Sequence, residues 1–177
     1  MKNIIILFTI LLAFSCEDKN EKNQELTPLE QLPPKTQVGA NTAGCLVDGK
    51  AVYPKGTFTR TFNLFYQNQK DLGISFTFEA SELKKSINIA SLNEELEVGK
   101  IYTLRTVENN SKYGQYFERF PNLSRIDYET NNEITGELRI THHNYNQATI
   151  SGTFWFDAVD KDGNKVEIRE GRFDGEY

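Results

Sequence analysis

The two histidines of the chain, His142 and His143, are the side chains best suited to acid–base or metal chemistry. They are neighbours, and neighbouring residues on a β-strand point to opposite faces, so the pair is poorly placed to chelate one ion. By parity, His142 shares the face of Leu138 and Ile140. We therefore expect His143 to point outward. A metal or proton-transfer site needs convergent ligands and an orienting partner, so neither histidine is assigned such a role.

Acidic residues gather after Asp157, in a pattern that superficially resembles a calcium-binding loop. Such a loop places carboxylates at alternate positions and ends in a bidentate glutamate. Glu167 comes too early for that geometry, and the segments on both sides alternate like paired strands. We therefore interpret Asp162 and Gly163 as a hairpin turn, and we expect no metal and no cofactor.

The motifs of common enzyme classes do not occur in the sequence, which has no Gly-x-Ser-x-Gly elbow, no His-Glu-x-x-His pair, no phosphate loop and no dinucleotide fingerprint. Cys45 could in principle act as a nucleophile, but its place beside Val47 in an apolar run indicates a small buried strand residue. Carboxylate pairs of the glycosidase type have no local signature. We predict a protein that is not an enzyme, with a hydrolase acting on glycans or lipids as the alternative.

Aromatic side chains give the clearest indication of a binding surface. Trp155 has the opposite parity to the apolar residues of its run, so an alternating strand presents it on the outer face. A second segment carries Tyr113, Tyr116, Phe117 and Arg119. Exposed aromatic faces stack on sugars or anchor a protein partner, so these five residues are the candidate ligand-binding residues. The alternative is that they pack beneath a loop, since large aromatic side chains usually bury most of their surface.

The beginning of the chain has the order of an export signal. Lys2 precedes an apolar run at 4–14, and a charged, polar stretch follows abruptly after residue 16. The run is too short for a membrane span, which takes about 20 residues, but it matches the apolar core of a secretory signal peptide. Residues 1–15 are therefore expected to be the signal peptide.

The sequence AFSC at 13–16 resembles the bacterial lipobox, in which the cysteine becomes the lipid-bearing first residue of the mature protein. Ala13 stands where that pattern favours leucine. The resemblance implies that Cys16 carries fatty-acyl chains such as palmitate and anchors the protein to a membrane. We expect a cell-envelope protein that is anchored in the outer membrane and faces the periplasm or the cell surface. The alternatives are an ordinary signal peptide that is cut elsewhere, or a short anchor.

Residues 17–40 differ in composition from the rest of the chain, because they contain no aromatic residue and many charges. Such a segment cannot bury enough surface to offset its ordering entropy. We predict that residues 16–40, which include the lipidated cysteine, form a flexible tether and that residues 41–177 form one domain. The alternative for part of the tether is a short helical turn through leucines 26, 29 and 32, which are spaced by three.

After residue 41, short runs of alternating apolar residues recur between Gly, Asn and Asp, which is the pattern of an antiparallel β-sandwich or barrel. The runs lie at 44–53, 62–66, 72–78, 87–89, 101–107, 126–128, 134–140, 148–158 and 165–177. Asp48 and Gly49 form the strongest hairpin signal. We predict an all-β domain of about 8–10 strands.

The last run has a break in its alternation. Ile168 has an even number and Phe173 an odd number, so one regular strand cannot bury both on the same face. An extra residue at Gly171 would restore the alternation, because glycine accepts the backbone conformation that one common bulge requires. We therefore predict a β-bulge or sharp bend within residues 170–172, with Ile168 and Phe173 both in the core. The alternative is that Phe173 and Tyr177 cover a second surface on the outer face, near Trp155.

Three segments are rich in turns, glycines and alternating residues: 32–56, VGKIYTL at 98–104, and ISGTFWFDAVDKDGNKVEIREGRFDGEY at 150–177. Together they resemble a family of Bacteroidota lipoproteins that share the domain of unknown function 6252. The resemblance implies an exported lipoprotein with an all-β domain and no assigned activity. It transfers no catalytic residue to this chain.

The net charge of the chain limits the classes of partner that it can bind. The formal net charge is -5 and the pI is near 5.2. Nucleic-acid binding needs a basic footprint that neutralises phosphates, so no nucleic acid is expected. We expect a monomer whose partners are the membrane, through the lipid on Cys16, and an envelope protein or a glycan.

Overall fold

The computed structural model of the chain describes residues 25–55, 61–80, 83–108 and 111–177. The expected signal peptide and Cys16 lie outside these ranges. Within them the chain forms eleven β-strands and no helix, which confirms the all-β class with slightly more strands than predicted. None of the described residues forms a helix long and apolar enough to cross a membrane.

The strands follow one another along the chain, and every pair is antiparallel. They are β1 (Thr42–Val47), β2 (Lys50–Val52), β3 (Phe62–Gln67), β4 (Asp71–Ala80), β5 (Leu83–Ser91), β6 (Ile101–Leu104), β7 (Lys112–Arg119), β8 (Arg125–Glu129), β9 (Gly136–Asn144), β10 (Thr149–Val159) and β11 (Lys165–Glu176).

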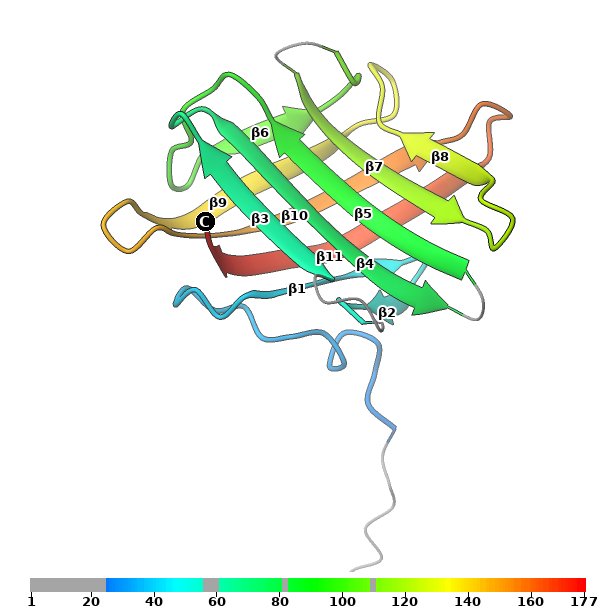
Figure 1. Cartoon of the computed structure of the whole chain (residues 1–177), viewed down its shortest axis with the longest axis horizontal. Coiled ribbons are helices and arrows are strands. Elements are labelled where there is room, and N and C mark those ends of the chain that lie inside the picture. Colours follow the sequence, from blue (N-terminus) through cyan, green and yellow to red (C-terminus); the bar gives the residue numbers. More distant parts are fainter. Residues whose placement is uncertain (1–24, 56–60, 81–82, 109–110) are drawn as a thin grey trace, which may run out of the picture.

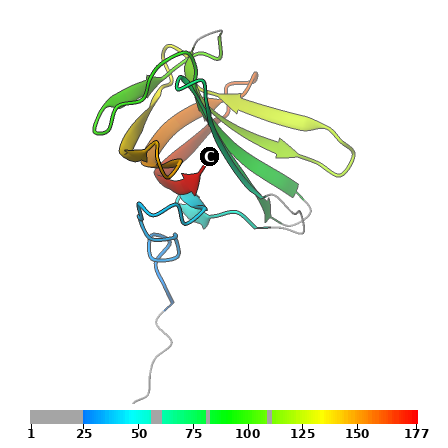
Figure 2. The same ribbon diagram turned by 60° about the vertical axis from the view of Figure 1, so that its left-hand side comes forward.

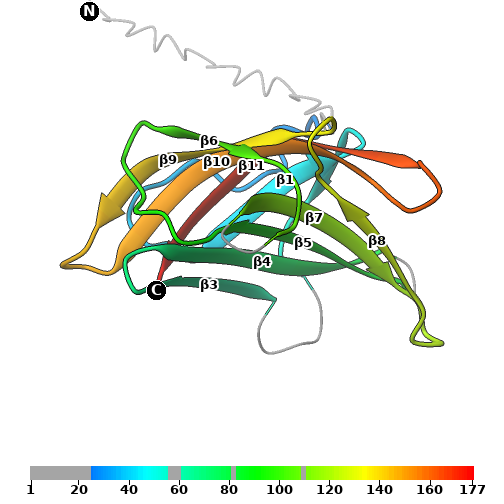
Figure 3. The same cartoon turned by 90° about the horizontal axis from the view of Figure 1, so that it is seen from above.

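The sheet folds over into two layers that face one another, as Figures 1 and 3 show. One layer contains β6, β9, β10, β11, β1 and β2 in that order, and the other contains β8, β7, β5, β4 and β3. The layers are continuous where Val159 of β10 pairs with Glu129 of β8. Across the described strands the sheet is not closed, because β2 and β3 end its main path without pairing with each other. Figure 2 shows the two layers as separate walls, so the fold is closer to a sandwich than to a closed barrel.

The core lies between the layers and is built from the residues whose alternation the sequence displays. Leu72, Ile74 and Phe76 of β4 are buried, as the period of two predicts. They belong to one hydrophobic cluster with Phe154 and Phe156 of β10, in the other layer. Burying a side chain of this size contributes about 1.5–3 kcal/mol, so these contacts hold the two layers together.

Two predicted hairpin turns are confirmed. Asp48 and Gly49 both adopt left-handed backbone angles, with φ of 48° and 78°, and connect β1 to β2. In the loop between β10 and β11, the carboxylate of Asp160 accepts hydrogen bonds from the backbone N–H groups of Asp162 and Asn164. The acidic segment of the sequence thus serves to hold a turn.

The predicted irregularity in β11 is confirmed. Phe156 of β10 pairs with Ile168 of β11, but Phe154 pairs with Gly171 instead of the next residue in register. One residue of β10 therefore opposes two of β11, which defines a β-bulge. Ile168 is fully buried and Phe173 is 3% exposed, so both lie in the core as predicted.

The residue with a left-handed backbone in this bulge is Glu170, with φ of 53°, and not Gly171. This corrects the expectation that the glycine supplies the positive φ. Gly171 is small for another reason, because a Cβ atom at this position would overlap the ring of Phe154. The close approach of an aromatic ring therefore explains the glycine.

A second irregularity corrects the predicted orientation of the histidines. The ladder between β9 and β10 shifts register at Thr141, which leaves one extra residue on β9. An extra residue reverses the side-chain alternation. His143 therefore points toward the core: its ring centroid is 4.9 Å from that of Tyr66, and its Nε2 is 3.1 Å from the hydroxyl of Tyr177.

Residues 32–40, here named the N-terminal strap, lie against the sheet (blue in Figure 1). Leu32 is 6% exposed, and the carboxylate of Asp174 on β11 accepts hydrogen bonds from the backbone N–H groups of residues 38–40. This corrects the prediction of a flexible tether for this part of the chain, and the folded body begins upstream of residue 41. A turn at 28–31 precedes the strap, in line with the alternative interpretation of that segment.

Candidate ligand-binding groove

Trp155 lies on the outer face of β10, as its parity predicts, and is 36% exposed. It lines a surface groove of about 380 Å³, which we name the Trp155 groove. Residues of β9 and β10 form the floor, the bulge of β11 borders one side, and Ile101 of β6 borders the other. Lys35 of the N-terminal strap also lines it. Segments far apart in the sequence thus build one depression on the outer face.

The indole of Trp155 is held by two charged side chains. Its Nε1–H donates a hydrogen bond of 3.1 Å to Oε2 of Glu137, and the guanidinium of Arg169 lies 5.6 Å from its ring centroid. Arg169 is in turn fixed by Asp157, with 2.6 Å between Nη2 and Oδ1. A cation over an exposed aromatic ring contributes about 0.5–1 kcal/mol. The ring is therefore oriented before any ligand arrives, which reduces the entropy cost of binding.

The charge of Asp157 keeps this arrangement in place. Burial raises the pKa of Asp157, but hydrogen bonds from Lys165 and Arg169 outweigh the burial and hold the pKa below its ordinary value. The carboxylate is thus ionised at neutral pH and keeps the guanidinium of Arg169 at the indole. This side chain, which the sequence pattern places in a possible calcium loop, forms ion pairs within the sheet instead.

Arg139 places an unpaired positive charge in the groove. It lies on β9, opposite Thr153 of β10 and Ile101 of β6. Within the described ranges, its exposed side chain makes no hydrogen bond, ion pair or ring contact. Lys35 is weakly paired, with 3.6 Å between its Nζ and Oε2 of Glu170. Both cations are therefore available to a ligand.

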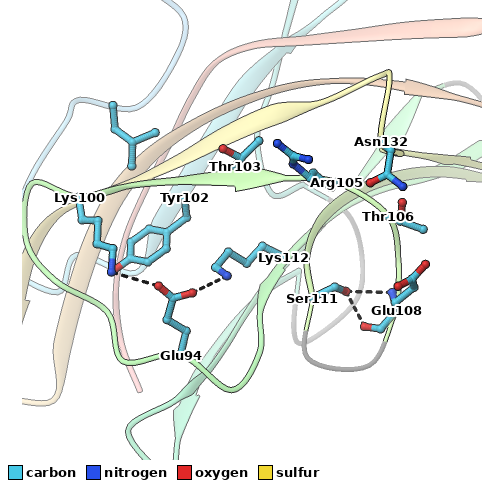
Figure 4. A pocket seen from close by; sticks show the side chains of 11 residues that line it. Glu94, Lys100, Tyr102, Thr103, Arg105, Thr106, Glu108, Ser111, Lys112 and Asn132 are labelled. Carbon is cyan, nitrogen blue, oxygen red and sulfur yellow. Dashed lines mark hydrogen bonds and ion pairs between the residues drawn. The ribbon is translucent and has the colours of Figure 1, made fainter.

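A second hollow, of about 470 Å³, adjoins the first because Ile101 lines both. Figure 4 shows the carboxylate of Glu94 between two amines: it lies 3.1 Å from Nζ of Lys100 and is bound on its other oxygen by Lys112. The hydrogen bond from Lys112 is the main reason why the pKa of Glu94 lies below its ordinary value. We name this depression the Glu94 hollow.

Arg105 lines the Glu94 hollow, and its side chain has no partner among the residues that the structure describes. In Figure 4 it lies on the side of Thr103 and Asn132, apart from the ion pairs of Glu94. The Trp155 groove and the Glu94 hollow are each lined by three basic and two acidic side chains. This local excess of positive charge contrasts with the net charge of -5 of the whole chain.

The other predicted binding residues lie on β7, in the opposite layer. Tyr113 and Phe117 are half-buried and Arg119 is exposed, all three on the outer side of that strand. Tyr116 is 2% exposed, and its hydroxyl donates a hydrogen bond of 2.6 Å to Oε1 of Glu118. The structure therefore does not bring this group into the groove, and Tyr116 is a core residue.

Cys45 and His143, which could supply nucleophilic or acid–base chemistry, also lie outside the groove. Cys45 is fully buried, as predicted, and burial raises the pKa of its thiol far above the ordinary range. Burial lowers the pKa of His143, which lies in an aromatic cluster with Tyr66 and Tyr145. No group of three or more potential metal ligands is present in the described part of the chain.

The sequence pattern did not identify Glu137, Arg139 and Ile101 as site residues. Their outward orientation could be predicted for β9, because Glu137 and Arg139 have the parity opposite to that of Leu138 and Ile140. The sequence pattern does not show the order of the strands in the sheet. Pairing of β9 with both β10 and β6 is what places these side chains beside Trp155.

The fold and the groove together define an all-β protein with one folded-over antiparallel sheet and an aromatic, cation-rich groove on an outer face. The family model of the domain of unknown function DUF6252 matches residues 68–175, and the chain belongs to this family. The resemblance noted in the sequence is thus confirmed at the level of the domain. No curated protein matches the chain. No solved structure matches it either.

Proposed function

We propose that this chain is an exported lipoprotein that binds a ligand through its all-β domain and catalyses no reaction. Lipid on Cys16 anchors it in the outer membrane, where it faces the periplasm or the cell surface as a monomer. The ligand is a glycan or an envelope protein, bound in the Trp155 groove. The order of Lys2, the apolar run at 4–14 and Cys16 supports the anchor.

The observation that carries the binding proposal is the fixed orientation of an exposed indole. A single exposed apolar side chain is common and needs no explanation. Trp155 differs, because Glu137 and Arg169 hold its ring at the floor of a groove. Binding sites combine such an aromatic surface with a few polar groups that fix the orientation of the ligand.

The pKa values of the carboxyl groups favour a binding function over a hydrolase function. A glycan hydrolase needs a carboxyl group whose pKa is raised, so that it can donate a proton near neutral pH. The described carboxyl groups with shifted pKa values are shifted downward, among them Glu94, Glu118 and Asp157. Each of these three accepts a hydrogen bond from a lysine or an arginine, which is a structural role.

The anchor is tested by metabolic labelling of cells with an alkyne-bearing fatty acid. The Cys16→Ala chain should lose the label and leave the membrane fraction, because the acyl chains attach to this sulfur. Cys45→Ala is the matched control, since it removes the other cysteine of the chain and should keep the label. Equal labelling of the wild-type and Cys16→Ala chains would refute the anchor.

The groove is tested by photo-crosslinking in whole cells. Trp155→Ala should abolish the capture of glycan or envelope protein by a photoreactive group at Thr153, which lies in the groove. Phe117→Ala is the matched control, because Phe117 is also an aromatic residue with an arginine near it, 5.0 Å from its ring, but it lies on the other layer. Loss of capture in both variants, or in neither, contradicts a role of the groove.

A further inference from the structure

The Trp155 groove and the Glu94 hollow lie along one line across the strands. The order β11, β10, β9, β6 places the bulge at one end and the edge strand β6 at the other. Neighbouring strands are about 4.8 Å apart, so three spacings span about 14 Å. Ile101 lines both depressions, and its 52% exposed side chain is the point where they meet. An occupant that touches both ends must therefore be an extended chain.

The side chains along this line match the surface of a sugar chain. A sugar ring has an apolar face of C–H groups, which packs on an indole, and an edge of hydroxyl groups. Around Trp155, the hydroxyl of Thr153 and the carboxylate of Glu137 can bind such hydroxyls. The indole uses only Oε2 of Glu137, and Oε1 has no partner among the residues that the structure describes, so it can accept a hydrogen bond from the ligand.

A protein partner fits this surface less well. Stable protein interfaces bury about 800 Å² on each side and have an apolar centre. Along the line from the bulge to β6, the large apolar side chains exposed among the described residues are Ile101 and Trp155. Charged side chains surround both.

The positive charges without a partner along this line indicate that the sugar is acidic. Arg139 lines the groove and Arg105 lines the hollow, and neither guanidinium has a partner in the described structure. A guanidinium binds a carboxylate with two parallel hydrogen bonds, which makes this pair stronger than a contact between neutral groups. Two such arginines on one path favour a ligand that repeats its carboxylates.

We propose that the Trp155 groove and the Glu94 hollow form one site for an acidic oligosaccharide of the uronic-acid class. One sugar ring packs on Trp155, one carboxylate binds Arg139, and a carboxylate further along the chain binds Arg105. This proposal rests on the ligand-binding function proposed above and names its ligand class.

The test uses the full chain, purified from membranes in detergent, and two oligosaccharides that differ only in charge. The first is a tetrasaccharide of galacturonic acid, and the second is the same tetrasaccharide with its carboxylates reduced to alcohols. Trp155 is the single tryptophan of the chain, so the change in tryptophan emission on titration reports on the groove. The acidic chain should bind at least about tenfold more tightly than the neutral one, because it alone forms charged hydrogen bonds.

Two variants locate the carboxylates. Arg139→Gln should weaken binding of the acidic tetrasaccharide and of the acidic disaccharide by about tenfold. Arg105→Gln should weaken binding of the tetrasaccharide alone, because a disaccharide on Trp155 does not reach the hollow. Phe117→Ala should bind both like wild type. Both arginine side chains lack partners in the described structure, so the melting temperatures of these variants should equal that of wild type.

The outcomes separate this proposal from the one on which it rests. Equal affinity for the acidic and neutral chains overturns the charge selectivity but leaves a saccharide-binding groove. An unchanged affinity of Arg105→Gln for the tetrasaccharide overturns the extended site. Failure of both sugars, together with capture of an envelope protein that depends on Trp155, overturns the saccharide but supports the binding function. Failure of both sugars without such capture overturns both proposals.

Discussion

The hydroxyl of Thr36 donates a hydrogen bond of 2.6 Å to the buried carboxylate of Asp174, although 138 residues separate the two in the chain. The same carboxylate accepts a hydrogen bond of 2.7 Å from the hydroxyl of Ser151 on β10. The backbone N–H groups of residues 38–40 complete its shell. Asp174 therefore joins the N-terminal strap to two neighbouring strands of the sheet.

We expect Asp174→Ala to lower the free energy of unfolding by about 3 kcal/mol. The substitution leaves several N–H and hydroxyl donors without an acceptor, and buried donors to a charged group are costly to leave unpaired. Urea denaturation measures the change. Asp127→Ala is the control, because Asp127 is a surface residue paired with its near neighbour Arg125 and should shift stability by less than about 0.5 kcal/mol. Equal effects of the two substitutions would contradict the role of Asp174.

Asp174 should also make stability depend on pH in the acid range. Burial raises its pKa, but hydrogen bonds from the strap and from Ser151 outweigh the burial and hold the pKa at about 2. An unfolded aspartate has a pKa of about 3.9, so the native state binds the proton more weakly than the unfolded state. The stabilisation of about 2.5 kcal/mol is therefore complete above about pH 4 and is lost as the pH falls toward 2.

Urea denaturation between pH 7 and pH 2.5 checks this dependence. The wild-type chain should lose stability on acidification more steeply than Asp174→Asn, whose amide does not titrate. Parallel curves for the two chains would show that the carboxylate of Asp174 does not set the acid limit.

The sequence predicted which residues are buried more reliably than how the strands pair. The alternation in β4 and β10 identified Leu72 and Phe156 as core residues, because the period of two is a local property. The inward orientation of His143 was not predicted, because it depends on a register shift at Thr141 that only the pairing of β9 with β10 creates.

The same limit applies to the candidate site and to the strap. Parity placed Trp155 on the outer face, but the cations around it come from β9, β11 and the strap, and no local pattern shows that these segments lie side by side. The composition of residues 32–40 resembles that of a tether. The carboxylate of Asp174 nevertheless accepts hydrogen bonds from three consecutive N–H groups of this segment. Because this acceptor is distant in the sequence, the composition of the segment does not predict the contact.

Removal of the strap should therefore destabilise the domain. A chain that begins at residue 41 should unfold at a lower urea concentration than one that begins at residue 25, with a difference of at least about 2 kcal/mol. Asp174→Asn should cost less in the shorter chain, because the donors that it loses are already absent. Equal stability of the two chains would restore the interpretation of residues 32–40 as a tether.

The bulge of β11 gives the last prediction, in which two neighbouring residues respond in opposite ways. Gly171→Ala should destabilise the domain by about 1–3 kcal/mol, because the added methyl group overlaps the ring of Phe154. Glu170→Gly should leave stability unchanged or raise it by up to about 1 kcal/mol, because Glu170 holds a left-handed φ of 53° that glycine adopts without strain.

A double-mutant cycle separates ring overlap from backbone strain at Gly171. If the ring is the cause, Phe154→Leu should recover part of the stability that Gly171→Ala removes, because the smaller side chain leaves room for the methyl group. If a strained backbone at Gly171 were the cause, the two losses would simply add. Thermal unfolding of the four chains decides between these results. Since Trp155 lies opposite this bulge, its emission maximum should also shift in Gly171→Ala and return toward the wild-type value in the double variant.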